Sequence, residues 1–238
     1  MPAKRETLIW ERMQTGRTAR RLDYGAIIRA TTCLADREGI EAVSMRHVAA
    51  ALDAGTMSLY RYVSGKDDLL DLVLDAAYGE IPLPARAGAD WIERIRRIAI
   101  DTRRVMRSHP WLASLVSRRP TLGPNYLSWF ESLLEATAVS GRSLPVRVRM
   151  IGTVWAYLSG AIAYELGERE TDRRHKLTAA KKRRIAQPYI ARLIGGGLHP
   201  HLAEFFTAGL GQQNEARQQE AFLAGLDAVL RGIQTMGS

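Results

Sequence analysis

Hydroxyls, phenols and a guanidinium gather in one short stretch of the chain, residues 56–62, which reads TMSLYRY. Leu59 and Val63 are four residues apart, so on a helix both would face inward and the other side chains would face outward. The outward set is Thr56, Met57, Ser58, Tyr60, Arg61 and Tyr62. Such groups form hydrogen bonds with base edges and phosphates, and a helix that carries them fits the major groove of DNA. The stretch therefore predicts DNA recognition.

Two short helices must position these side chains. Ser44 can cap the first, in which Val48 and Leu52 recur at helical spacing. Residues 53–55, Asp-Ala-Gly, tolerate the backbone angles of a tight turn, and Thr56 can cap the second helix. This is the pattern of a helix-turn-helix, although helical proteins that never bind nucleic acid also contain such pairs.

A phosphate-binding end is predicted directly after the second helix. Ser64 and Asp67 have the spacing of a capping box, and Lys66 falls in the first turn of the helix that follows, up to about Gly79. Exposed N–H groups together with Lys66 would hold a phosphate. The predicted DNA-binding set is completed at the start of the first helix by Ser44 and Arg46.

Residues 22–70 resemble the N-terminal domain of the tetracycline repressor (TetR) family. The resemblance rests on Leu22, Ile27, Ala30 and Gly39, on the helix SMRHVAAAL, and above all on LYRYVSGKDDLL. This last run is similar to the family signature Leu-Tyr-x-His-Phe-x-x-Lys-x-x-Leu-Leu. The chain departs from the family at Asp53, where glycine is usual, and at Tyr62 and Val63, which replace His and Phe.

The second half resembles the family's C-terminal domain in the segments HPWLASLVSRRP and FLAGLDAVLRGI. The resemblance implies a homodimer that represses transcription from a palindromic operator on double-stranded DNA. It also implies a pocket in the C-terminal domain for a small-molecule effector. Binding of the effector moves the helix that follows the helix-turn-helix, which is called the reader below. Two alternatives stay open: an activator or effector-independent regulator, and a helical enzyme or small-molecule carrier without DNA function.

Helical periodicity extends over the whole chain, so we expect an all-α protein in three parts. These are a basic, mobile arm at 1–21, a three-helix DNA-binding domain at 22–80, and a larger helical domain at 88–238, with the boundary at the prolines of 81–88. The uncharged segment 150–164 and the stripe 222–233 carry more apolar surface than one domain readily covers. We therefore place the dimer interface at Ile151, Leu158, Ile162, Phe222, Leu226, Val229, Leu230 and Ile233.

The second half is rich in amphipathic aromatic side chains, which are either plain core or the wall of a mostly apolar pocket. The pocket interpretation predicts an apolar or aromatic effector. It would contact Met106, His109, Trp111, Tyr126, Trp129, Phe130 and Trp155.

No catalytic motif is found in the sequence, so we expect neither an enzyme nor a cofactor. His199 and His201 form the one close histidine pair, without the further ligands of a metal site. The net charge of +9 favours a polyanionic partner, yet the basic arm and the charged segment 169–184 fit solvated surface as well as DNA contact. With one cysteine, Cys33, interpreted as a packing residue, and no signal or membrane segment, we expect a cytoplasmic protein.

Overall fold

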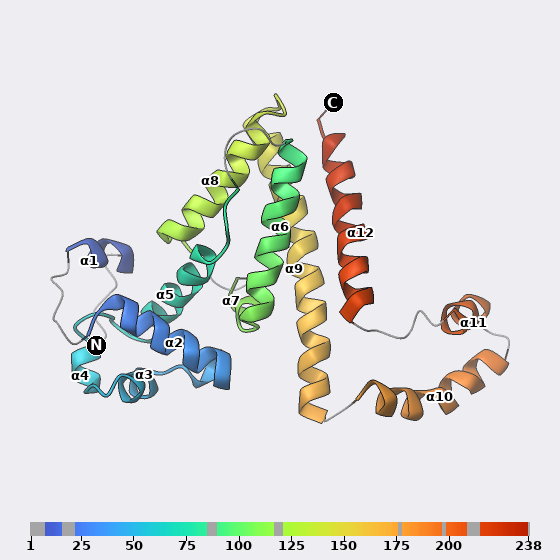
Figure 1. Ribbon diagram of the computed structural model, residues 1–238, viewed down its shortest axis with the longest axis horizontal. Helices are drawn as coiled ribbons and strands as arrows, with labels where there is room; N and C mark the ends of the chain where they lie inside the picture. The colour runs from blue at the N-terminus through green and yellow to red at the C-terminus, as the bar shows by residue number, and fades with distance from the viewer. Residues whose placement is uncertain are drawn as a thin grey trace.

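The computed structural model describes residues 8–15, 22–84, 90–116, 121–175, 178–196, 199–208 and 215–237. Within these ranges the chain is all-helical and contains no strand, which confirms the predicted fold class (Figure 1). The helices in chain order are α1 (Ile9–Thr15), α2 (Tyr24–Glu38), the 3-10 turn η1 (Ile40–Ala42), α3 (Met45–Ala51), α4 (Thr56–Leu59), α5 (Lys66–Gly79), α6 (Trp91–Ser108), α7 (Leu112–Val116), α8 (Pro124–Ala138), α9 (Leu144–His175), α10 (Ala179–Gly195), α11 (Pro200–Thr207) and α12 (Glu215–Gln234).

Local capping defines the first helices, and the cap at Ser44 is the one that the sequence predicts. The Asp23 carboxylate accepts a hydrogen bond from the Ala26 N–H at 2.6 Å and so begins α2. Gly39, with φ at +88°, ends it. The Ser44 hydroxyl accepts from the His47 N–H at 3.2 Å and begins α3. The turn after α3 takes Asp53 into the left-handed region at φ +48°.

Helix α5 joins the two halves of the molecule, because it packs against α2 on one side and α8 on the other. The side chains of five apolar residues in its middle are buried: Leu69, Leu70, Leu72, Val73 and Leu74. In Figure 1, α5 runs from the small N-terminal helices up to α8. A rigid displacement of α8 relative to α2 therefore has to be absorbed by this helix.

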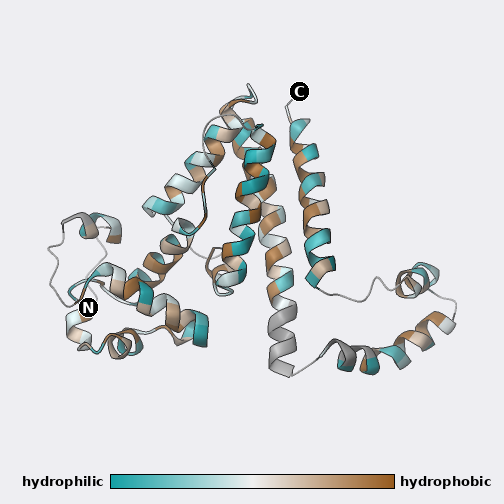
Figure 2. Cartoon of the chain, viewed as in Figure 1, coloured by the Kyte–Doolittle hydropathy of each residue, from teal (hydrophilic) through white to brown (hydrophobic). Residues whose placement is uncertain are grey.

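The larger half is a bundle of α6, α8, α9 and α12 (Figure 1). The predicted uncharged segment 150–164 is the middle of the 32-residue helix α9. In Figure 2, apolar and polar positions alternate along α12, as expected for a helix with one face in the core. The Tyr157 hydroxyl of α9 donates to the Phe222 carbonyl of α12 at 2.8 Å, which ties the two helices together.

Helices α10 and α11 lie apart from the bundle in Figure 1. Helix α10 continues through Pro188 and ends at Gly195. The side chains of most of the charged segment 169–184 lie outside the described residues. No helix in the described ranges combines the length and the apolar character needed to cross a membrane.

Two expectations about the N-terminal part are wrong. Residues 9–15 of the predicted mobile arm form helix α1, which packs on α5 with Ile9 buried. The Arg12 guanidinium donates to the Ser64 hydroxyl and to the Asp68 carboxylate, each at 2.5 Å. Residues 1–7 and 16–21 of the arm lie outside the described residues. Cys33 is exposed on α2 and is not a packing residue.

Candidate nucleic-acid interface and pocket

The short helix α4 presents the face that the sequence predicts. Leu59 and Val63 are fully buried beneath it, while Met57 is 78% exposed and Tyr60 is 48% exposed. Arg61 is also exposed, and the side chains of Thr56 and Ser58 are half-buried. The hydroxyls of Thr56 and Ser58 are thus held on a helix that is anchored in the core, and the phenol of Tyr60 and the guanidinium of Arg61 follow in the turn that ends it.

Tyr62 does not point outward, so this part of the prediction is wrong. Its hydroxyl donates to the Leu22 carbonyl at 2.6 Å, and its ring meets Tyr24 edge to face at 5.5 Å between centroids. The Tyr24 hydroxyl donates in turn to the Tyr62 carbonyl at 3.2 Å. These contacts hold the end of the reader against the start of α2. Thr56 is the first helical residue of α4, not its cap, which is Gly55.

The end of the reader is fixed by a carboxylate other than the predicted one. Asp68, not Asp67, accepts the Ser64 N–H, at 2.6 Å, and the helix begins after Gly65. Lys66 donates to the Glu41 carbonyl at 3.3 Å, which positions its ammonium beside the 3-10 turn η1. The ammonium therefore lies at the N-terminus of α5, where positive charge and N–H groups attract an anion.

Ser44 and Arg46 lie at the start of α3. The Ser44 hydroxyl oxygen is engaged by the cap of α3, and Arg46 is exposed. The sequence interpretation overlooked His47, which is exposed next to Arg46 and whose Nδ1 lies 2.9 Å from the Ala42 carbonyl. The sequence signal that could have identified His47 is its polar side chain next to Arg46 in the first turns of the predicted helix. Together these groups can bind phosphates and read base edges, and they offer no nucleophile or acid–base pair.

A pocket of about 230 Å³ lies between α5, α8 and α9. Its wall contains no charged residue, and four of the seven residues predicted to contact the effector belong to two of these helices: Tyr126, Trp129 and Phe130 from α8, and Trp155 from α9. Tyr78 of α5 meets Tyr126 edge to face at 5.1 Å between centroids. The wall can therefore hold a planar apolar molecule, and phenols supply hydrogen bonds.

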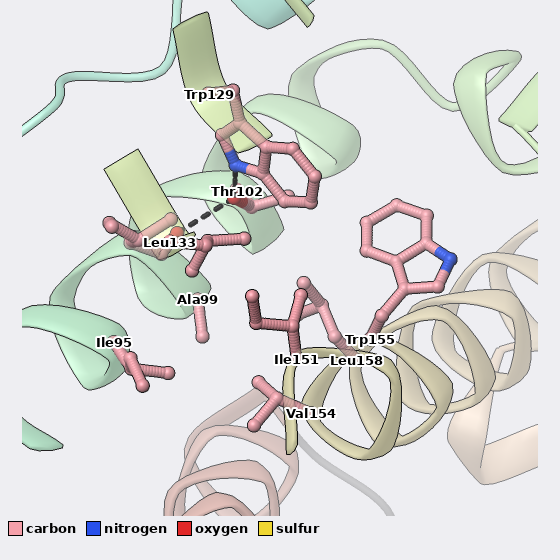
Figure 3. Close-up of a pocket in the computed structure, with 10 residues that line it drawn as sticks. Ile95, Ala99, Thr102, Trp129, Leu133, Ile151, Val154, Trp155 and Leu158 are labelled. Atoms are coloured by element: carbon pink, nitrogen blue, oxygen red, sulfur yellow. Dashed lines mark hydrogen bonds between the residues drawn. The ribbon is translucent and has the colours of Figure 1, made fainter. Parts of the chain in front are cut away.

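The polar groups of the aromatic side chains in this wall are uncharged, and one of them already has a hydrogen-bond partner. Burial raises the pKa of the Tyr78 phenol, so the hydroxyl stays neutral at every physiological pH. The Trp129 N–H donates to the Thr102 hydroxyl at 3.2 Å, as Figure 3 shows. Figure 3 draws a second, smaller void of about 10 Å³ beneath Trp129 and Trp155, between α6, α8 and α9. That void is no larger than one water molecule.

The other three residues predicted for effector binding lie elsewhere. Met106 borders only a void of about 10 Å³, and neither His109 nor Trp111 is in the wall of the 230 Å³ pocket. Instead, His109 Nδ1 and the Trp111 N–H both meet the Asp36 carboxylate of α2 at 2.7 Å. His109 Nε2 lies 3.1 Å from the Glu80 carboxylate. These residues connect the two halves of the molecule.

The predicted dimer interface lies on the wrong face of its helices. Seven of the eight predicted residues, namely Ile151, Leu158, Ile162, Phe222, Leu226, Leu230 and Ile233, are buried within the single chain, and Val229 is half-buried. A partner cannot reach side chains that their own protomer already covers. The exposed faces carry small residues: Gly152, Ala156, Gly160 and Ala163 on α9, and Ala221, Ala224, Ala228 and Gly232 on α12.

Metal binding has no support in the described part of the chain, where no group of three or more His, Cys, Asp or Glu side chains converges on one point. His199 precedes α11 and His201 lies in its first turn.

Comparison with known proteins assigns both halves. A family model described as "Bacterial regulatory proteins, tetR family" matches residues 27–73, and one described as "Tetracyclin repressor-like, C-terminal domain" matches residues 83–237. The HTH-type transcriptional repressor DrrR1 of Streptomyces coeruleorubidus is 34% identical, over 96% of this chain and 84% of its own. An HTH-type transcriptional regulator of Saccharopolyspora erythraea is 35% identical, over 92% and 91%. These families and relatives are transcriptional regulators and not enzymes.

Solved structures share the fold. The Streptomyces coelicolor TetR family protein ActR in complex with actinorhodin superposes with a TM-score of 0.74, covering 92% of this chain and 99% of its own at 23% identity.

The contact between His109 and its two carboxylates gives a prediction about pH. Burial lowers the pKa of the imidazole, but the hydrogen bonds and charges of Asp36 and Glu80 raise it more, so the pKa lies above its ordinary value of 6.5. The charged imidazole therefore stabilises the fold fully below the unfolded pKa, and this contribution is lost as pH rises through the folded pKa.

We expect His109→Gln to lower the free energy of unfolding most at about pH 5–6 and progressively less toward about pH 9. Urea unfolding across this range measures the difference, and His201→Gln, at an exposed position, is the control. A wild-type-to-variant difference that stays constant over the range would contradict a charged His109.

Proposed function

Because this chain belongs to the TetR family and is a DNA-binding transcriptional repressor, we propose that two copies bind the half-sites of a palindromic operator and are released by a planar, largely apolar effector. The observation that carries this proposal is the continuity of α5. One end of α5 holds Lys66 and the Asp68 contact to the reader, and its other half contributes Tyr78 to the pocket wall. A repressor bound to bacterial chromosomal DNA acts in the cytoplasm.

The reader face supports direct contact with the major groove. Arg61 lies in the turn directly after α4 and is exposed, so its guanidinium can form two hydrogen bonds with one guanine. Tyr60, Lys66 and Arg46 flank α4 and suit phosphates, which set the position of the helix without selecting a sequence.

The exposed faces of α9 and α12 support a four-helix interface between two copies, in keeping with a family whose members act as dimers. Added side-chain atoms at Gly152, Gly160 and Gly232 would meet no atom of the same chain within 4 Å. Small residues at intervals of three or four let two helices approach closely, so the interface is defined by shape rather than by large apolar side chains. A symmetric interface of this kind places two readers on one operator.

The pocket wall supports an uncharged, planar aromatic effector. Tyr126 and Phe130 lie with their rings 8° from parallel, on the same face of α8. ActR, which shares the fold, has been solved with actinorhodin. At about 230 Å³ the pocket lies below the roughly 300–1,000 Å³ that drug-sized ligands occupy, so a larger effector has to displace α8 from α9.

Two substitutions at the reader test the DNA assignment on fragments selected by genomic footprinting. We expect Arg61→Ala to lose about 1–3 kcal/mol of operator binding and to relax the preference at one base pair. We expect Lys66→Ala to weaken binding to all DNA sequences alike. The slope of log affinity against log salt concentration should fall in magnitude by about one. Identical sequence profiles and salt slopes for the two variants would contradict the division into a base contact and a phosphate contact.

The interface is tested by a charge on its exposed face. Ala224→Glu should yield folded monomers, because an unpaired charge in a helix interface costs several kcal/mol, and should abolish tight operator binding. Leu226→Glu should instead lower protomer stability, since Leu226 is 0% exposed. Ala138→Glu, on the exposed end of α8, is the control for added charge. A sedimentation profile of Ala224→Glu that remains dimeric would exclude this face.

The pocket is tested with actinorhodin and with compounds handled by the products of neighbouring genes, followed by tryptophan fluorescence. Quenching should weaken in Trp129→Phe and in Trp155→Phe and stay unchanged in Trp111→Phe, because Trp129 and Trp155 are in the pocket wall and Trp111 is not. An effector that weakens operator affinity must bind the operator-bound protein more weakly by the same factor. Undiminished quenching in the double variant Trp129→Phe/Trp155→Phe would place the ligand elsewhere.

A further inference from the structure

Asp75 is a buried carboxylate in the middle of α5, and the N–H groups that donate hydrogen bonds to it belong to α8. It is 2% exposed. One carboxylate oxygen accepts the Tyr126 N–H at 2.9 Å, and the other accepts the Asn125 N–H at 3.3 Å. These are N–H groups of the first turn of α8, which have no partner within their own helix. The residue before α8, Gly123, makes no side-chain cap. Helix α5 therefore supplies the cap of the helix that forms the pocket wall.

The approach of the two helices at this point requires a glycine. A Cβ atom built on Gly123 would lie 2.1 Å from an Asp75 carboxylate oxygen, which is closer than any real contact. Burial raises the pKa of the Asp75 carboxyl, and the N–H groups of Tyr126 and Asn125 offset part of this rise. The contact thus joins a buried acceptor to the positive end of a helix dipole, and it has one defined geometry.

The contact lies between the pocket and the reader. One turn beyond Asp75, Tyr78 packs against Tyr126 and Trp129, with ring centroids 5.1 and 5.3 Å apart. Two turns before it, Asp68 accepts the Ser64 N–H of the reader at 2.6 Å. The packing of aromatic rings permits sliding, because apolar contact is not directional. Two hydrogen bonds to successive N–H groups do not permit it.

We propose that Asp75 is the positioning residue that couples the two sites, by forcing α5 and the first turn of α8 to move together. Displacement of α8 by a ligand then reaches the reader through α5, and operator binding reaches the aromatic wall by the same contact. The coupling rests on the proposed operator binding, and a gel shift with the wild-type chain tests that separately.

The test uses operator DNA as the only ligand. The full chain is labelled with 5-fluorotryptophan, and the Trp129 resonance is assigned with Trp129→Phe. In the wild type this resonance should shift when the operator duplex is added. In Asp75→Asn, which keeps the shape of the side chain but loses its charge, the shift should disappear. Operator affinity should remain within about threefold, because a protein that already populates the DNA-competent state loses little when coupling is removed.

Gly123→Ala disrupts the same contact from the side of α8. The operator-induced shift can be measured in this variant if Asp75→Asn folds poorly. The matched control is Thr137→Val, which removes a buried hydroxyl at the opposite end of α8 and should keep the shift. A normal operator-induced shift in a folded Asp75→Asn or Gly123→Ala protein would overturn the proposal, as would a wild-type protein that binds operator without any shift. If the pocket binds no effector, the result of this experiment is unchanged, because the experiment contains no effector.

Discussion

Helix α5 belongs to the cores of two domains at once, and several polar contacts of the molecule serve to position it. Helix α5 buries apolar side chains against α2 and against α8, so it has little exposed surface of its own. Apolar packing on both sides holds the helix in place but does not define its register. Two buried carboxylates add directional contacts: Asp68 accepts the N–H of Ser64 in the turn before α5, and Asp75 accepts two N–H groups of α8.

Local sequence signals predicted the reader well. Ser44 acts within a few residues of itself in the chain, and the structure confirms the helix cap that it predicts. Tyr62 was assigned wrongly because its partner, the Leu22 carbonyl, is forty residues away in the chain. Helical spacing places a side chain on a face, but only tertiary contacts decide whether a hydroxyl is already used. The assignment of DNA-contacting residues stays a prediction.

The C-terminal half shows a different limit. Apolar periodicity finds the face of a helix that is buried, and it found the inner faces of α9 and α12 correctly. The error was to read that surface as an excess needing a second chain, whereas α6 and α8 already cover it. A face made of alanine and glycine gives no periodic apolar signal. His109 and Trp111 were missed as interdomain residues for a similar reason, since Asp36 is remote in sequence.

Helix α1 shows how a basic composition can hide a structural element. Its Arg12 guanidinium bridges Ser64 and Asp68, so α1 fixes the junction between the reader and α5. The same region would face phosphates, and a lone Asp68 carboxylate there would repel them. Neutralising Asp68 with Arg12 removes this repulsion while its oxygen still accepts the Ser64 N–H. The contacts at Asp68, Asp75 and His109 thus set the position of α5 at its start, its middle and its end, and a ligand that displaces one of them has to redistribute the others.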